Sequence, residues 1–178
     1  ASKHQHAARW VQSIITSPYF RVYTNDDIVG VELGGALKNI IAIGTGICDG
    51  LQYGNNSKAV FMTRGLAEIA RLGVAAGASP MTFSGLAGMG DLVTTCSSTM
   101  SRNHRVGELL AGGRTLDEVR GILDNVAEGI DTTSAAVSLA AQLGVEMPIV
   151  QATHNVLFNC VPIRQAISDL LERDPKLE

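Results

Sequence analysis

Residues 28–47 read IVGVELGGALKNIIAIGTGI, an almost continuous apolar run interrupted by glycines. A helix that is apolar on nearly all sides is buried by the elements around it. We therefore expect residues 28–47 to form a central helix, with the rest of the chain packed around it. The segments that follow also have helical patterns, so the sequence predicts a mainly α-helical fold.

One stripe of this expected helix is made of residues four positions apart: Gly30, Gly34, Lys38, Ala42 and Gly46. Residues four apart are neighbours on a helix face. Because Gly costs about 1 kcal/mol relative to Ala inside a helix, such a helix forms only where close packing compensates. We expect the stripe to let the backbone of another segment, or a ligand, approach the backbone of this helix closely.

Lys38 is the only charged residue between Glu32 and Asp49. Burying an unpaired ammonium is costly, so Lys38 must find an anion, lose its proton or extend to water. A lysine that extends to water from the rim of a domain needs no function. The pattern alone leaves these alternatives open.

Most of the chain after residue 50 is also predicted to be helical. Residues 57–76 are amphipathic, and Ser79-Pro80 is typical of a helix start. Asp91 and Ser101 are each expected to cap a helix, and Thr115 with Glu118 has the capping-box pattern. Further helices are expected over residues 131–143, ended by Gly144, and over residues 148–158 and 163–172.

The first 26 residues have a different pattern. Residues 2–16 are predicted to form a helix, and residues 19–24 (YFRVYT) alternate as in a β-strand. No later segment offers a partner strand, and an unpaired strand leaves its backbone groups without hydrogen bonds. We therefore expect residues 1–26 to be the tail of a larger α/β domain, with an ordinary N-terminal arm as the alternative.

Residues 101–105 (SRNHR) begin a helix expected to reach about Leu110. Cationic side chains in a first turn oppose the helix dipole unless an anion binds there. Arg102 offers a planar set of donors suited to phosphate, and Asn103 adds an amide. A solvated basic helix start with Ser101 as its cap fits the pattern equally well.

The glycine-rich segment 85–92 (GLAGMGDL) permits a tight turn before Asp91, whose functional role would be a hydrogen bond to a substrate hydroxyl. Residues 40–50 (IIAIGTGICDG) resemble a strand followed by a dinucleotide fingerprint. The third glycine is one place late, and residues 51–56 are expected to form a loop instead of the helix that holds the pyrophosphate. We therefore reject a dinucleotide site in this segment.

Composition excludes several classes of protein. The net charge of −3 and the 46% hydrophobic content are ordinary for a globular protein, so nucleic acid is not expected as a partner. No run is expected to reach the roughly 18 apolar residues of a membrane span. Cys48, Cys96 and Cys160 are expected to be buried thiols in a reducing, cytoplasmic compartment. The four histidines lack metal-ligand spacing, so no metal site is expected.

Several segments, taken in order, resemble the glycerol-3-phosphate dehydrogenases of the bacterial NAD(P)-dependent type. Residues 31–39 (VELGGALKN) resemble the helix with the catalytic lysine, and residues 63–68 (TRGLAE) resemble the second helix. Residues 85–91, followed by TTC at 94–96, are similar to the substrate-binding turn. Residues 101–103 match the phosphate and cofactor contacts, and residues 126–129 (VAEG) resemble a segment that touches the cofactor. The similarity runs from about residue 20 to residue 168.

The resemblance implies a two-domain oxidoreductase that interconverts dihydroxyacetone phosphate and sn-glycerol 3-phosphate with NAD or NADP and supplies glycerol phosphate for phospholipid synthesis. Residues 1–26 would then be the tail of a truncated dinucleotide-binding (Rossmann) domain. Residues 27–178 would form the helical substrate and catalytic domain, of the type found at the C-terminus of 6-phosphogluconate dehydrogenases. A small phosphate-bearing substrate and a homodimer are further expectations.

The resemblance also assigns roles to residues. Lys38 would be the catalytic residue, because a carbonyl that becomes an alkoxide during hydride transfer needs a nearby acid. Substrate would be held by Lys38, Asp91, Ser101, Arg102 and Asn103. The cofactor would contact Arg102, Val126 and Glu128, with Asn39 and Thr95 as secondary contacts of the site.

Two other functions remain open at this point. One is a different dehydrogenase with a helical second domain, of the 6-phosphogluconate or ketopantoate reductase type. The other is a helical dimerisation module without catalysis, in which the small-residue stripe is only a packing seam and Arg102 is a surface residue.

Overall fold

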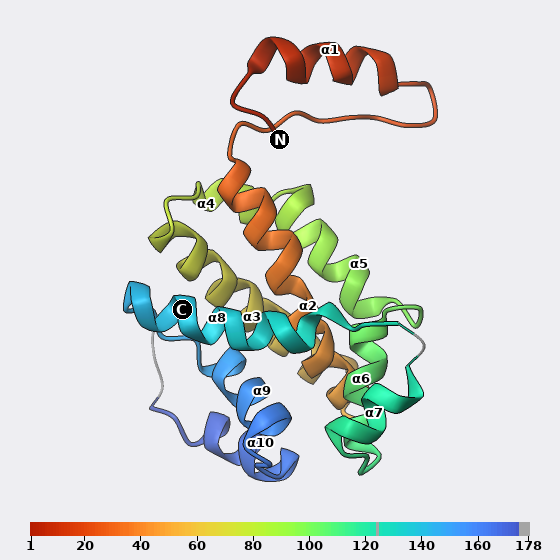
Figure 1. Cartoon of the computed structure of the whole chain (residues 1–178), viewed down its shortest axis with the longest axis vertical. Helices are drawn as coiled ribbons and strands as arrows, with labels where there is room; N and C mark the ends of the chain where they lie inside the picture. The colour runs from red at the N-terminus through yellow and green to blue at the C-terminus, as the bar shows by residue number, and fades with distance from the viewer. Residues whose placement is uncertain (124, 175–178) are drawn as a thin grey trace.

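Helix α2 (Ile28–Gly50) lies at the centre of a helical bundle in the computed structural model, which describes residues 1–123 and 125–174 (Figure 1). The helices with the most extensive packing on it are α3 (Asn55–Ala75), α5 (Asp91–Ser97), α6 (Arg102–Ala111) and α8 (Glu128–Leu143). The remaining elements of the bundle are α4 (Pro80–Phe83), the π-helical turn η1 (Leu86–Gly90), α7 (Leu116–Ile122), α9 (Pro148–Phe158) and α10 (Ile163–Leu171). The central helix predicted for residues 28–47 is confirmed, and it continues to Gly50.

Two groups of buried apolar side chains hold the bundle together, and both include residues of α2. One group joins Ile40 and Ile41 of α2 to Leu72 of α3 and Val150 of α9. The other joins Ile43 and Ile47 of α2 to side chains of α6, α7 and α8, among them Val106, Val119 and Ile130. Fully burying such a side chain stabilises the fold by about 1.5–3 kcal/mol, so α2 is fixed along most of its length.

The buried environment of α2 also accounts for its composition. Its mean hydropathy reaches 1.4 over an 18-residue window, which is enough by length and composition alone for a membrane span. Glu32 and Lys38 nevertheless interrupt the helix, so no unbroken apolar run reaches this length. Within the fold, 56% of that window is buried. Since helices of the same chain cover it, the apolar run is that of a core helix.

Close approach of backbones explains the glycines in the stripe. A Cβ at Gly46 would overlap the carbonyl oxygen of His104 and lie 3.1 Å from the Cα of Gly107. A Cβ at Gly34 would lie 2.6 Å from the carbonyl oxygen of Ala87. Helix α6 and turn η1 therefore pack on α2 backbone to backbone, as the stripe predicts.

The helix ends follow the local signals in the sequence. The Thr115 hydroxyl accepts a hydrogen bond from the Glu118 N–H, and the Glu118 carboxylate accepts one from the Thr115 N–H, which confirms the capping box. Gly144 ends α8 in the left-handed region with φ of +66°. Ser101 caps α6 by accepting from the His104 N–H at 3.3 Å.

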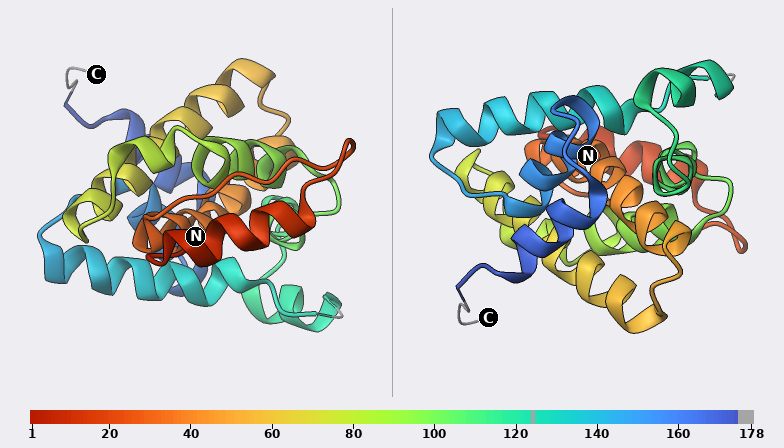
Figure 2. Two further views of the ribbon diagram at one scale, coloured as in Figure 1. Left: turned by 90° about the horizontal axis from the view of Figure 1, so that it is seen from above. Right: turned by 90° about the horizontal axis from the view of Figure 1, so that it is seen from below.

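Residues 1–26 form a helix and an extended return segment at one end of the bundle (Figures 1 and 2). Helix α1 (Gln5–Ile15) confirms the predicted helix, but none of its residues is buried. The strand expected over residues 19–24 is not formed; one isolated bridge joins Ser17 to Phe20. No neighbouring strand among the described residues supplies backbone partners. The return segment is instead held by a bond from Gln12 Nε2 to the Val22 carbonyl oxygen.

Candidate active site

Lys38 lies on α2 and forms an ion pair with Asp91 at the start of α5. Its Nζ is 2.5 Å from Asp91 Oδ2, and the two side chains are 19% and 37% exposed. Of the three outcomes open to a lysine on a buried helix, the structure shows the first, in which the ammonium finds an anion. Both groups remain partly open to solvent, so a small molecule can reach the pair.

Asp91 owes its position to turn η1. The expectation that its side chain caps α5 was wrong, because Gly90 occupies the N-cap position and the carboxylate binds Lys38. The turn lies against α2 at Gly34, and a Cβ at Gly88 would overlap the backbone of Phe83. Glycine at both positions lets η1 pack close enough to α2 for Asp91 to reach Lys38.

The start of α6 carries the three residues predicted to bind phosphate. Arg102 is exposed and borders a small cavity of about 220 Å³, whose other lining residues are Ile122, Leu123 and Asn125. Asn103 is only 8% exposed, and its Oδ1 accepts from the Gly129 N–H at 2.9 Å. The Asn103 carbonyl therefore joins α6 to α8, a contact that the sequence pattern did not indicate.

Asn39, Asn103 and Gly129 meet at one point, although they come from three helices. A Cβ on Gly129 would lie 2.7 Å from both the Asn39 carbonyl oxygen and the Asn103 Oδ1. Because Asn39 follows Lys38 and Gly129 follows Glu128, this contact brings the lysine helix, the Arg102 turn and the start of α8 together. The predicted motifs therefore converge around the middle of α2.

The remaining predicted residues differ in exposure. Val126 is 69% exposed, and Glu128 is exposed in the first turn of α8. Thr95 is half-buried on α5. Exposed side chains at the start of α8 can contact a ligand that approaches from outside the bundle. Thr95 is less accessible.

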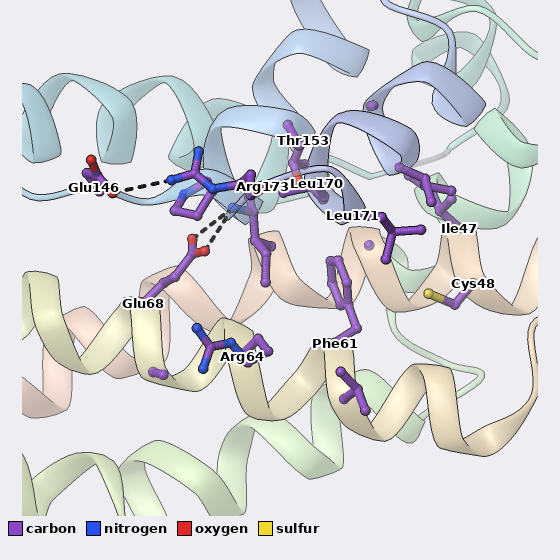
Figure 3. Close-up of a pocket in the computed structure, with 18 of the residues that line it drawn as sticks. Ile47, Cys48, Phe61, Arg64, Glu68, Glu146, Thr153, Leu170, Leu171 and Arg173 are labelled. Atoms are coloured by element: carbon purple, nitrogen blue, oxygen red, sulfur yellow. Dashed lines mark hydrogen bonds and ion pairs between the residues drawn. The ribbon is translucent and has the colours of Figure 1, made fainter. Parts of the chain in front are cut away.

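A much larger cavity of about 1430 Å³ lies elsewhere, bordered mainly by α3, α9 and α10 (Figure 3). None of the predicted site residues lines it. Glu68, which does, is 3% exposed and accepts hydrogen bonds from the N–H groups of Ile149 and Val150 at the start of α9. Burial raises the pKa of Glu68 more than these two bonds lower it. Glu68 thus ties α3 to α9.

A second polar cluster was not found from the sequence. Asp49 Oδ2 is 2.5 Å from Lys58 Nζ and 2.8 Å from His104 Nε2. No local pattern indicates this cluster, because His104 is 55 residues from Asp49. Only the crossing of α2 and α6 places the imidazole beside the carboxylate.

The cysteines differ from the expectation in one respect. Cys48 and Cys96 are buried free thiols, but Cys160 is exposed. Burial raises the pKa of Cys96 to about 11, so this thiol stays protonated near neutral pH. Among the described residues, no three His, Cys, Asp or Glu side chains form a group that could hold a metal ion.

Known proteins resemble this chain over its whole length. Residues 27–168 match the family described as NAD-dependent glycerol-3-phosphate dehydrogenase C-terminus. The chain is 54% identical to proteins of Geobacter sp. (strain M21) and Enterococcus faecalis (strain ATCC 700802 / V583), each named glycerol-3-phosphate dehydrogenase (NAD(P)+). These alignments cover 100% of this chain but 53% and 52% of the relatives, so the chain spans about half the length of the curated relatives it matches.

Comparison of the fold with solved structures leads to the same family. A crystal structure of glycerol-3-phosphate dehydrogenase from Coxiella burnetii matches with a TM-score of 0.90 at 40% identity, over 96% of this chain and 52% of that one. This likeness and the family match favour glycerol-3-phosphate dehydrogenase over the other dehydrogenase families left open by the sequence. The chain belongs to the family of NAD-dependent glycerol-3-phosphate dehydrogenase C-terminal domains.

Proposed function

We propose that this chain is the substrate-binding and catalytic half of an enzyme that interconverts dihydroxyacetone phosphate and sn-glycerol 3-phosphate with NAD or NADP. The observation that carries the proposal is the convergence of separate motifs on the middle of α2. Lys38 pairs with Asp91, and the neighbouring Asn39 packs against Gly129, which binds Asn103. A packing seam alone does not require an ion pair that is partly open to solvent on the central helix.

Lys38 would act as the general acid and base. During reduction, the carbonyl carbon gains a hydride and its oxygen takes a proton from Lys38 Nζ. In the oxidation direction, the amine takes that proton back. Asp91 accepts a hydrogen bond from Nζ and so holds the ammonium in place. A positioned group of this kind contributes about 10²–10⁴-fold to such a rate.

Arg102 would bind the phosphate of the substrate, at the N-terminus of a helix whose dipole favours an anion. Its guanidinium is exposed, so no buried partner occupies it. Ser101 and Asn103 flank it, and both already bind backbone N–H groups through their side-chain oxygens. We infer that these two residues set the shape of the turn as well as touching the substrate. Phosphate held away from the carbonyl orients the reacting carbon.

The nicotinamide cofactor would contact Arg102, Val126 and Glu128, whose side chains are all exposed, and Arg102 also lines the small cavity. These residues fit such a ligand, because a guanidinium binds phosphate and a carboxylate accepts from sugar hydroxyls. When bound, the cofactor supplies or accepts the hydride. We further propose that residues 1–26 are the end of the dinucleotide-binding domain that precedes residues 27–178 in the full-length enzyme. The unpartnered helix α1 supports this assignment.

The setting of the enzyme is also proposed. Two buried free thiols fit a reducing cytoplasm, and glycerol 3-phosphate made there is a backbone precursor for phospholipids. The wide cavity beside α3 and α10 supports a homodimer, since a second copy would cover its apolar lining. Light scattering on the full-length enzyme tests this assembly, and a monomer across the micromolar range would refute it.

Replacing Lys38 with Met tests the proposed chemistry, because Met keeps the side-chain length and removes the amine. In the full-length enzyme we expect kcat to fall by about 10²–10⁴-fold. The matched control is Arg164→Met, an exposed cation on α10, which should leave kcat unchanged. A folded Lys38→Met enzyme with near-normal kcat would contradict the assignment of Lys38.

Arg102→Ala tests the phosphate contact separately from the chemistry. At saturating cofactor, which compensates for a lost cofactor contact of Arg102, we expect the KM for dihydroxyacetone phosphate to rise, with little change in turnover of dihydroxyacetone, which lacks the phosphate. Steady-state kinetics with both substrates gives the comparison. Unchanged affinity for the phosphorylated substrate would rule out Arg102 as its ligand.

A further inference from the structure

Asp49, Lys58 and His104 join three helices at the end of α2. One carboxylate oxygen, Asp49 Oδ2, receives hydrogen bonds from Lys58 Nζ of α3 at 2.5 Å and from His104 Nε2 of α6 at 2.8 Å. Because a carboxylate only accepts, Nε2 of His104 must carry the hydrogen in this bond. The cluster is separate from the Lys38–Asp91 pair, and the proposed chemistry does not use it.

The charges in this cluster reinforce one another. Burial raises the pKa of Asp49, but the hydrogen bonds from Lys58 and His104 outweigh that effect and hold the pKa below its ordinary value. Asp49 is therefore ionised at neutral pH, and Lys58 balances its charge. Hydrogen bonds to an ionised acceptor are about twice as strong as neutral ones, so the imidazole has a firm anchor.

His104 has little freedom to move within α6. It is 4% exposed, its N–H is capped by the Ser101 hydroxyl, and its carbonyl oxygen lies against Gly46 of α2. Its Nδ1 is buried without a hydrogen-bond partner in the structure. Among the described residues, the bond to Asp49 is thus the one hydrogen bond that fixes the ring.

We propose that Asp49 and His104 are positioning residues for the phosphate-binding turn, a role that rests on the function proposed above. His104 follows Arg102 and Asn103 in the first turn of α6. The Asn103 bond to Gly129 holds one side of that turn, and the His104 bond to Asp49 holds the other. With both anchors in place, Arg102 is presented at a fixed distance from Lys38.

The experiment compares His104→Leu and His104→Gln in the full-length enzyme. Leucine fills the space without a donor, whereas the glutamine amide can still donate to Asp49. The readout is kcat/KM for dihydroxyacetone phosphate divided by kcat/KM for dihydroxyacetone, which isolates the contribution of the phosphate. Because misplacement by about 1 Å can cost up to about 10²-fold, we expect His104→Leu to lower this ratio at least about tenfold. His104→Gln should recover most of the loss.

The matched control is His154→Leu. His154 also has a buried Nδ1 without a partner, but it lies on α9 against Phe158. It should leave the ratio unchanged. Asp49→Asn serves as a second test if the leucine variant does not fold, and it should lower the ratio in the same direction. In an Arg102→Ala background, His104→Leu should cause no additional loss.

The outcomes separate the two proposals. If the unmodified enzyme does not reduce dihydroxyacetone phosphate, the proposed function fails. If it does, and folded His104→Leu or Asp49→Asn enzyme keeps the normal ratio, only the positioning role fails. Equal losses of activity with both substrates would also overturn that role, because they indicate a purely structural effect.

Discussion

Two neighbouring glycines of α2 provide a sharp test of how this domain is packed. A Cβ at Gly34 would lie 2.6 Å from the carbonyl oxygen of Ala87 in turn η1, whereas a Cβ at Gly35 would meet nothing within 4 Å. Both residues lie in the interior of the same helix. Replacing either with Ala therefore gives the same gain in helix propensity, about 1 kcal/mol.

The two variants differ only in the contact with η1. Close carbon–oxygen contacts lie at about 3.3–3.6 Å, so Gly34→Ala must push the Ala87 carbonyl away by about 0.7–1 Å. Such overpacking costs about 1–3 kcal/mol. Since the propensity gain cancels between the variants, Gly34→Ala should be less stable than Gly35→Ala by that amount. For a chain of this size the difference corresponds to about 2–12 °C in Tm.

Thermal and urea unfolding of the 178-residue chain, followed by circular dichroism, measures the difference. Gly35→Ala should be slightly more stable than the unmodified chain. In the full-length enzyme, Gly34→Ala should also lower kcat, because Asp91 moves with η1 and no longer holds Lys38 in place. Equal stability of the two alanine variants would refute the close packing of η1 on α2.

Three other predictions concern stability. Glu68→Gln should gain stability relative to the unmodified chain as the pH rises above 4.5. Because the pKa of Glu68 is raised, its protonated form favours folding, and this contribution is lost at higher pH. Unfolding free energies of both proteins across pH 4 to 7 measure the change, and a stability difference that does not vary with pH would contradict the sign. Asp27→Asn should reduce the loss of stability as the pH falls below 3.8. Hydrogen bonds from Thr82, Gly30 and Ser79 outweigh burial and hold the pKa of Asp27 low. Unfolding free energies of the two proteins between pH 3 and 5 measure this effect. Thr115→Ala should destabilise the chain by about 1 kcal/mol through loss of its capping box, and an unchanged Tm would show that α7 does not depend on this cap.

The comparison of sequence with structure separates local from distant effects. Sequence patterns within one or two helical turns were sufficient to predict where these helices lie and end. Examples are the apolar run of α2, the Thr115–Glu118 capping box and the left-handed Gly144. The spacing of the small residues also predicted that another backbone would approach α2. These features depend on the backbone preferences of single residues and on their neighbours along the chain, and both can be read from the sequence.

Pairings between distant residues could not be predicted in the same way. Lys38 and Asp91 are 53 residues apart, and Asp91 looked like a helix cap until η1 placed its carboxylate beside the lysine. The Asn103–Gly129 and Asp49–His104 contacts likewise follow from how α6 crosses α2 and meets α8. Residues 19–24 show the opposite error, a predicted element that is not formed. Their alternating pattern is typical of a strand, but without a partner strand they make no β-ladder.

The sequence by itself determined that a long apolar helix with a single embedded lysine would organise an α-helical domain. Only the tertiary structure decided what that lysine pairs with and how the Arg102 turn is anchored. The physical reason is that helix formation depends on contacts a few residues apart, whereas an ion pair or buried hydrogen bond depends on the packing of whole helices.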